Sequence, residues 1–502
     1  MFYMLTALLA LVAAAAAAPS RATTKACNEL SDSLSDHVSF PLSLSFHRES
    51  NAYWSTVLRD EKPACIVFPK SADHVSTAVK ILNQYPSVKF TVKSGGHDPN
   101  PDHATVPNGV LISMRDISGA SYDSEKNVAY VKPGGEWNEV ISSLEEESVT
   151  VVGGRLGIVG VGGFLLQGGI SFLSAQYGMA VDNIVGWEMV LPNGTIANVT
   201  VKDHPELAVA LKGSGSQFGI ATQFTLLAHQ IDKVWGGIRI FTSGKRDQIF
   251  KTLHDLVPHS NEDPKGAIIV SDTIAIASTE IYIVFFFYND ASPPSSGPFA
   301  DLLKVDSLID YTSTQTYGEL LKSNGFGASL LNSRISFRTL TIPHIPNNPN
   351  IYAEITDKMT ELLGDYLSDP FHLTAQCSVD FQPLPSIVGK HSEHRGGNAM
   401  GLSGSDGDRL ILELQCAWTD EDDDSVLPSV TKDLTDWIET KIPGWLNAKD
   451  ASGESYLPLF MNDAMADQNV TGSYRDFEKF KALQLQNDPD GTLRTRVGGF
   501  KY

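Results

Sequence analysis

A short apolar run that ends in two glycines and a histidine is the part of the sequence best suited to chemistry. The run covers residues 89–92, and Ser94, Gly95, Gly96 and His97 follow it. Because glycine allows backbone conformations and close approaches that side chains forbid, the N–H groups of such a turn can wrap an anion such as a pyrophosphate. The histidine would then lie beside the bound group. The alternative is a β-turn that carries a surface histidine.

A second segment, residues 153–183, interleaves nine glycines with apolar residues. Each glycine inside a helix costs about 1 kcal/mol relative to alanine, so we expect no stable amphipathic helix here. The composition suits backbone packed flat against a rigid planar ligand, or else a tight core crossing without a ligand. Other nucleotide motifs do not fit: there is no Gly-x-x-x-x-Gly-Lys-Ser/Thr, and the glycines of 213–219 are spaced wrongly for a Rossmann turn.

Four segments in this order resemble the berberine-bridge-enzyme-like oxidases, within the vanillyl-alcohol-oxidase-type FAD superfamily. They are Ser-Gly-Gly-His at 94–97, the glycine-rich run at 153–183, Leu-Lys-Gly-Ser-Gly-Ser-Gln-Phe-Gly-Ile-Ala-Thr at 211–222, and the C-terminal residues 487–493 and 498–502. The resemblance implies bound FAD and a covalent bond from His97 to the 8α-methyl group of the flavin. It places the cofactor contacts at Ser94, Gly95, Gly96, His97, Gly153, Gly154, Val159, Gly160, Gly162, Gly163, Gly168, Gly169, Asp182, Asn183, Gly219 and Ile220.

One departure from the family pattern concerns the flavin link. Many relatives attach the flavin a second time through a cysteine, and alignment on the Val-Gly-Val-Gly-Gly run at 159–163 places Leu156 at that position. No cysteine occurs between residues 65 and 377, so we expect a single link through His97. In plant relatives the residue matching Val159 controls oxygen access, and valine permits it. Molecular oxygen is therefore the expected acceptor.

The candidate base lies in the apolar run 409–418, because the family places its base on the substrate sheet. Alternation with period two puts Glu413 and Gln415 on the more polar face, which suits a pocket over the flavin. Glu413 would then be the base and Gln415 would orient substrate; alternatively, Glu413 meets solvent at a sheet surface. Asn462 matches a family position near the ring and is a third catalytic candidate. Asp463 replaces a tyrosine found in many relatives, which argues against the tyrosine-based mechanism.

No polar cluster predicts a metal site. His391-Ser-Glu-His394 has a two-histidine spacing but lacks a third ligand nearby, so we interpret it as a polar loop. The acidic residues 420–424 precede an expected helix, and their charges suit its N-terminal dipole.

The order of elements predicts an α+β protein. Expected strands at 65–68, 89–92, 110–112 and 128–131 alternate with a helix at 74–82, while 280–288 reads as a strong strand. The resemblance adds a two-part FAD-binding domain of the PCMH type and a substrate domain, an antiparallel sheet with helices on one face. The expected boundaries are 1–18 (signal peptide), 19–58 (N-terminal segment tied by a disulfide), 59–230 (FAD domain), 231–450 (substrate domain) and 451–502 (berberine-bridge-like segment returning to the FAD domain).

Composition indicates a globular protein, and the N-terminal segment indicates export. The chain of 502 residues is 42% hydrophobic, which is enough for two packed domains, and its net charge of −21 argues against nucleic acid and anionic membranes as partners. Residues 5–18 are apolar and end in alanines, as in a cleaved secretory signal. No later run approaches the roughly 18 apolar residues that a membrane span needs. The expected location is extracellular or an endomembrane lumen.

Cysteines and sequons agree with export. Relatives join positions equivalent to Cys27 and Cys65, and the chain-entropy model assigns such a loop roughly 3–4 kcal/mol. Cys377 and Cys416 lie in strand-like runs, and their pairing is left open. The glycosylation sequons begin at Asn193, Asn198 and Asn469.

The sequence thus predicts a secreted oxidoreductase with FAD linked once, through His97. The implied mechanism is substrate deprotonation with hydride transfer to flavin N5 and reoxidation by oxygen. The motifs resemble the fungal branch, many members of which act in secondary-metabolite pathways. The alternatives are a sugar or oligosaccharide oxidase of the same family and a non-enzymatic secreted glycoprotein that keeps the fold. A small molecule and oxygen are the expected partners, and the oligomeric state is left open.

Overall fold

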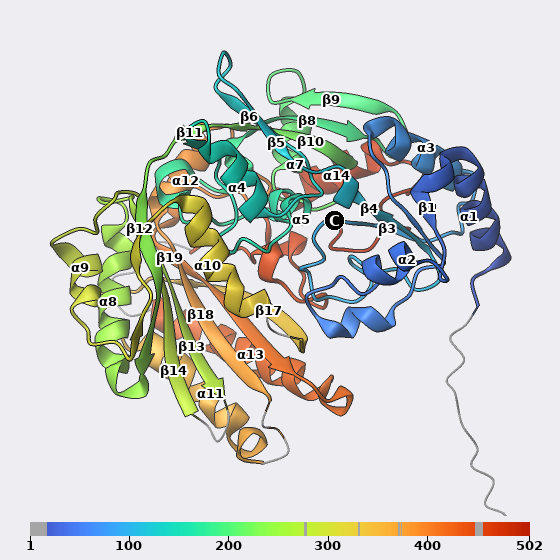
Figure 1. Ribbon diagram of the computed structural model, residues 1–502. Helices are drawn as coiled ribbons and strands as arrows, with labels where there is room; N and C mark the ends of the chain where they lie inside the picture. The colour runs from blue at the N-terminus through green and yellow to red at the C-terminus, as the bar shows by residue number, and fades with distance from the viewer. Residues whose placement is uncertain (1–17, 276–278, 330–331, 370–371, 373, 447–454) are drawn as a thin grey trace, which may run out of the picture.

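The computed structural model describes residues 18–275, 279–329, 332–369, 372, 374–446 and 455–502 (Figure 1). Of the predicted signal peptide, residues 1–17 lie outside the described residues. Three main sheets organise the chain, two small ones and a large one, and the small sheets lie together on one side of Figure 1. No helix within the described ranges is both long enough and apolar enough to cross a membrane.

The first small sheet presents the Ser-Gly-Gly-His turn. Its order is β1-β2-β4-β3, with β2, β4 and β3 parallel. A buried cluster joins the sheet to α1 and α3, and the disulfide Cys27–Cys65 ties α1 to β2. The bounds are α1 Arg21–Leu34, β1 Val38–Ser39, α2 Leu44–Glu49, β2 Cys65–Val67, α3 Ala72–Asn83, β3 Phe90–Lys93 and β4 Val110–Ser113.

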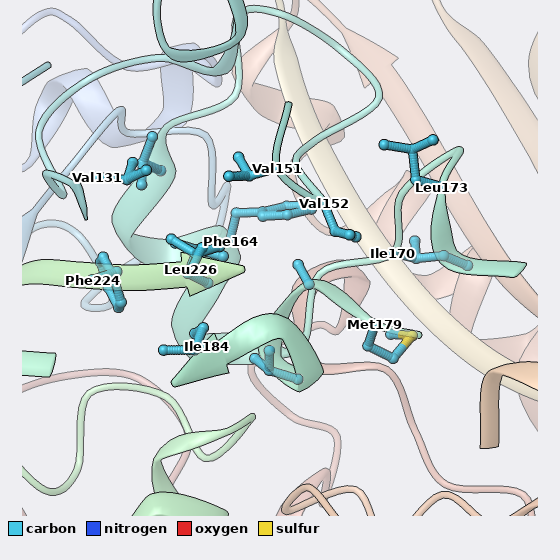
Figure 2. Close-up of a cluster of buried hydrophobic side chains, with 14 of the residues drawn as sticks. Val131, Val151, Val152, Phe164, Ile170, Leu173, Met179, Ile184, Phe224 and Leu226 are labelled. Atoms are coloured by element: carbon cyan, nitrogen blue, oxygen red, sulfur yellow. The ribbon is translucent and has the colours of Figure 1, made fainter. Parts of the chain in front are cut away.

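The second small sheet, in the order β5-β6-β10-β8-β9, supports the glycine-rich segment. Figure 2 shows Phe164, Ile170 and Met179 of that segment in one buried cluster with Val131 and Phe224 of the sheet. The bounds are β5 Ala120–Asp123, β6 Val128–Val131, α4 Trp137–Glu145, β7 Val149–Thr150, α5 Val161–Gln167, α6 Ser174–Tyr177, β8 Ile184–Val190, β9 Ile196–Thr200, α7 Pro205–Leu211, β10 Ile220–Leu227 and β11 His229–Gln230.

The large sheet has the order β15-β12-β14-β13-β18-β19-β17, with β16 paired to β12. Side chains from α8, α11 and α13 pack on one face of it in a continuous apolar cluster. The bounds are β12 Val234–Thr242, α8 Arg246–His259, β13 Gly266–Ala275, β14 Thr279–Tyr288, α9 Gly297–Leu303, β15 Ile309–Asp310, β16 Ser313–Gln315, α10 Tyr317–Ser329, β17 Arg334–Pro343, α11 Ile351–Ser368, β18 Gln376–Leu384, α12 Ser386–His394, β19 Arg409–Trp418, α13 Val426–Leu446 and α14 Phe477–Asn487.

The predicted α+β class with an antiparallel sheet and helices on one face is confirmed. Cys377 and Cys416 lie directly opposite each other on β18 and β19 and form a second disulfide, which answers the question left open by the sequence. Two local predictions are wrong. The glycine-rich segment contains the seven-residue helix α5, because its apolar residues are anchored in the core, and His391 and His394 lie in the last turn of α12 rather than in a loop.

Candidate active site

A cavity of about 720 Å³ separates the glycine-rich loops from the large sheet. This volume falls within the range of pockets that hold small molecules and cofactors. Its wall draws on both glycine-rich loops, the start of β10, the strands of the large sheet and residues near the C-terminus. The predicted residues in this wall are Ser94, Gly95, Gly96, His97, Gly154, Val159, Gly160, Gly162, Gly163, Gly219, Ile220, Glu413, Gln415 and Asn462.

The two glycine-rich loops touch backbone to backbone. A Cβ atom added to Gly95 would lie 2.7 Å from the Cα of Gly160, so a larger residue cannot be accommodated without moving main chain. Ser94 joins the loops further, since its Oγ donates to the carbonyl of Pro133 at 2.5 Å and accepts from the N–H of Gly162 at 3.1 Å. The loops therefore form one rigid wall with their peptide groups close to the cavity.

His97 lies in this wall as a stacked, neutral ring. Its imidazole stacks on the ring of Trp54, with ring centroids 4.2 Å apart and planes 15° apart. The backbone N–H of Trp54 donates a hydrogen bond to the backbone carbonyl of Gly96. Burial lowers the pKa of His97 to about 4, against a smaller opposing effect of Asp98. A neutral imidazole keeps a free lone pair, as a nucleophile requires. This placement differs from the surface histidine of the alternative interpretation.

Five residues predicted to contact the cofactor lie outside the cavity wall and shape the loop instead. Asp182 accepts hydrogen bonds from the N–H of Met179 and the amide of Asn398, and Asn183 donates to two backbone carbonyls. Asn462 both lines the cavity and supports the loop, because its Oδ1 accepts a hydrogen bond from the N–H of Gly169 at 3.0 Å. The five are Gly153, Gly168, Gly169, Asp182 and Asn183.

On the opposite wall, the large sheet presents a group of carboxylates. Glu413 on β19 is paired directly with Asp380 on β18, so both side chains project to the cavity face. Glu413 also shares a hydrogen bond with Asp463, which lies in the turn Met461–Asp463 of the C-terminal segment and not on the sheet. Gln382 links this group to the glycine-rich loop, because its Nε2 donates to Asp463 at 2.9 Å and its Oε1 accepts from Arg155. Glu413 is thus in the cavity wall rather than on an outer sheet surface.

Burial raises the pKa of each of these carboxyl groups. It raises the pKa of Asp463 to about 6 and that of Asp380 to about 6, although hydrogen bonds from Gln382 and from two serines act the other way. The pKa of Glu413 is raised well above its usual value by burial and then by the negative charges of Asp463 and Asp380. Near neutral pH the Glu413–Asp463 pair therefore retains a proton. A carboxyl group with its pKa near the working pH can act as a general base or acid.

Several residues of the site were missed by reading the sequence. Trp54 belongs to an N-terminal segment that gave no signal of its own. Arg155 and Asp380 are charged residues inside otherwise apolar segments, and this contrast could have predicted that they belong to the site. Asp463 was not predicted to be a partner of Glu413, and Gln382 had no distinguishing pattern. Among the described residues, no group of three or more His, Cys, Asp or Glu side chains could hold a metal ion.

The wall is suited to FAD. The touching glycines leave backbone close to the cavity, as a flat ring system needs, and neutral His97 lies at the end of the first loop. Leu156 lines the cavity and offers no thiol for a second link.

Comparisons with known proteins agree with this geometry. Residues 63–200 match the model of the FAD binding domain family. An uncharacterised FAD-linked oxidoreductase of Arthroderma benhamiae is 32% identical over 92% of each chain, and the FAD-dependent monooxygenase drtC of Aspergillus calidoustus is 28% identical over 91% of this chain and 86% of its own. The structure of berberine bridge enzyme from Eschscholzia californica superposes with a TM-score of 0.70 at 16% identity, covering 95% of this chain and 99% of that one.

Proposed function

The chain belongs to the FAD-linked oxidoreductases with the berberine-bridge-enzyme fold, and from this premise we propose that it oxidises a small organic molecule with oxygen as electron acceptor. The predicted family and the expectation of an enzyme are confirmed. One observation carries the proposal: a single cavity holds neutral His97 on its loop wall and the Glu413–Asp463 pair on its sheet wall. The cavity thus has a site for the cofactor on one side and a proton acceptor on the other.

Bound FAD would supply the hydride acceptor, and the protein would hold and orient it. The loop wall would contact the ring and phosphates through the residues around Gly95 and Gly160. His97 would provide the single covalent link, since its ring is neutral and Leu156 replaces the cysteine of doubly linked relatives. Val159, also in the wall, would leave room for oxygen.

Glu413 would remove a proton from the substrate as the hydride leaves the adjacent carbon. For this step Glu413 must be ionised; because burial and the charges of Asp463 and Asp380 raise its pKa, we expect this step to become faster as the pH rises. Gln415, two residues along the same face, would orient the substrate. Asn462 would hold the loop under the ring through its bond to Gly169.

We further propose that the protein is exported and acts in secondary metabolism. Two disulfides suit an oxidising compartment, and the three sequon asparagines, Asn193, Asn198 and Asn469, are all exposed. With the apolar N-terminal segment, these features support secretion or residence in an endomembrane lumen. The proposed role in secondary metabolism is implied by the resemblance of the motifs to the fungal branch.

The test begins with the flavin link. Acid precipitation of the purified protein should leave flavin bound to the wild-type chain, while His97→Ala should release it. His103→Ala is the matched control, because His103 lies in the same wall but is paired with Asp98. Flavin that stays attached in His97→Ala would refute the link. Oxygen uptake measured with polyketide, alkaloid and sugar panels then separates the proposed function from the sugar oxidase alternative.

A further inference from the structure

The sheet wall of the cavity changes character from one edge to the other. Near β12 and β14 its side chains are aliphatic or aromatic, whereas on β18 and β19 they are polar or acidic. The strand β13 lies between and carries Ser271 and Thr273 at the transition. The apolar side chains are Ile238, Ile240, Ile269, Ile281, Ile283 and Phe285. A ligand in this cavity therefore meets a long apolar surface that ends in a polar one.

The polar end carries more negative than positive charge. Near neutral pH the Glu413–Asp463 pair keeps one proton, so this pair and Asp380 together carry two negative charges; among the described residues that line the cavity, Arg155 supplies the one guanidinium that faces them. Arg155 hydrogen-bonds to Gln382, and in the part of the chain that the structure describes no ion pair joins it to any of the three carboxylates. A ligand carboxylate placed there would meet uncompensated charge of the same sign. A hydrogen-bond donor would meet acceptors.

Two groups in the wall lack partners that a ligand could supply. Of the two carboxylate oxygens of Asp380, Oδ1 is buried and has no hydrogen-bond partner among the described residues, whereas Oδ2 is not among the buried atoms without one. Asn324 on α10 is only 3% exposed, lines the same cavity, and has neither amide atom bonded within the described ranges. Buried polar groups are costly unless they are hydrogen-bonded. Asp380 thus favours a polar ligand group at this end of the cavity, and Asn324 favours a second one where α10 lines the cavity.

We propose that Asp380 is a specificity-determining residue, which with Glu413 binds a hydrogen-bond donor of the substrate while the apolar body lies against the isoleucine side chains. The donor is a protonated amine or a hydroxyl group, and substrates with a carboxylate at this position are excluded. The inference rests on the proposed function, because it concerns the substrate of the same cavity. Asp380 selects the substrate, and Glu413 removes the proton.

The first experiment measures binding to the holoenzyme by calorimetry with three probes that each carry one phenyl ring: benzylamine, benzyl alcohol and benzoate. The amine or the alcohol should bind at least about tenfold more tightly than benzoate, and Asp380→Asn should abolish that preference. Loss concentrated on benzylamine identifies a cationic donor, and loss concentrated on benzyl alcohol identifies a hydroxyl. Asp272→Asn is the matched control, because Asp272 lies on the neighbouring strand and faces away from the cavity. Equal affinity for all three probes, or a preference unchanged in Asp380→Asn, overturns the inference.

A second measurement needs no variant. Asp380 and Asp463 have pKa values raised to about 6, and the other titratable groups facing them are Glu413 and Arg155. As the pH falls from 7.5 to 5, these carboxylates take up protons, so benzylamine should bind more weakly and benzoate more tightly. Affinities that change in the opposite direction contradict the inference. Flavin content and anaerobic reduction are measured on the same samples, so that a protein without flavin refutes the proposed function, while a flavinylated protein without selectivity refutes only the role of Asp380.

Discussion

The two walls of the cavity are built in different ways. The loop wall is mainly backbone: Gly95 and Gly160 touch through main-chain atoms, and the fit leaves no room for a methyl group. The sheet wall is made of side chains, and its properties come from charge, as in the Glu413–Asp463 pair. The loop wall therefore has one permitted shape, which suits a constant cofactor, whereas the sheet wall can change its chemistry without changing the fold.

The most severe change should be a methyl group in the loop wall. In Gly95→Ala the new Cβ would lie 2.7 Å from the Cα and 2.8 Å from the nitrogen of Gly160, and neither backbone atom can turn aside. We expect a loss of about 3 kcal/mol of stability and a protein purified without flavin. Thermal unfolding and the flavin-to-protein absorbance ratio measure both effects.

Gly163→Ala is the matched control for Gly95→Ala. Gly163 lies in the same wall on α5, but an added Cβ would meet no protein atom within 4 Å. Since alanine favours a helix over glycine by about 1 kcal/mol, the unliganded chain should keep its stability. If Gly95→Ala unfolded at the wild-type temperature with full flavin content, the loop wall would be far less rigid than the contact implies.

A substitution in the sheet wall should slow flavin reduction without disturbing the fold. Glu413→Gln keeps the shape of the side chain but removes the proton acceptor, so anaerobic flavin reduction should slow by at least about two orders of magnitude while FAD stays bound. Glu280→Gln, on β14 with its side chain hydrogen-bonded to Tyr282 away from the cavity, is the matched control. A near wild-type reduction rate in Glu413→Gln would transfer the role of base to Asp463.

The loop wall could be predicted from the sequence more completely than the sheet wall. The residues of the loop wall lie in contiguous segments with many glycines, so 94–97 and 159–163 were recognised as local patterns, and alternation along one strand selected the correct face for Glu413. The partners of Glu413 come from elsewhere: Asp380 from a paired strand, and Arg155 from the opposite wall. Their proximity depends on strand register and on the packing of the sheet against the loops, which no local pattern encodes. Gly168 and Gly169 show the converse, since they share the pattern but lie behind the wall.

Substitution of Trp54 tests whether a side chain contributes to the loop wall, which is mainly backbone. Its ring stacks on His97 and contacts Phe337 of the large sheet, with centroids 5.1 Å apart, so it fixes the imidazole plane from the sheet side. Trp54→Ala should slow covalent flavin attachment about tenfold, because a reacting group that is held less precisely reacts more slowly. In-gel flavin fluorescence after denaturation follows the attachment. Trp54→Phe, which keeps a ring, should restore most of the rate; equal rates in all three proteins would exclude a positioning role.

The smallest expected effect concerns oxygen and Val159, which lies in the loop wall beside Gly160. Because this wall is rigid, one added methylene at Val159 cannot be absorbed by the loop and must project into the cavity. Val159→Leu should therefore slow the reaction of the reduced enzyme with oxygen by less than about tenfold, equivalent to at most about 1.4 kcal/mol of barrier, without changing anaerobic reduction. Stopped-flow reoxidation measures this rate, with Val426→Leu, 37% exposed on α13, as the control substitution. Reoxidation that is unchanged or faster in Val159→Leu would show that oxygen reaches the flavin from the sheet wall, and the division of tasks between the two walls would have to be reversed for this step.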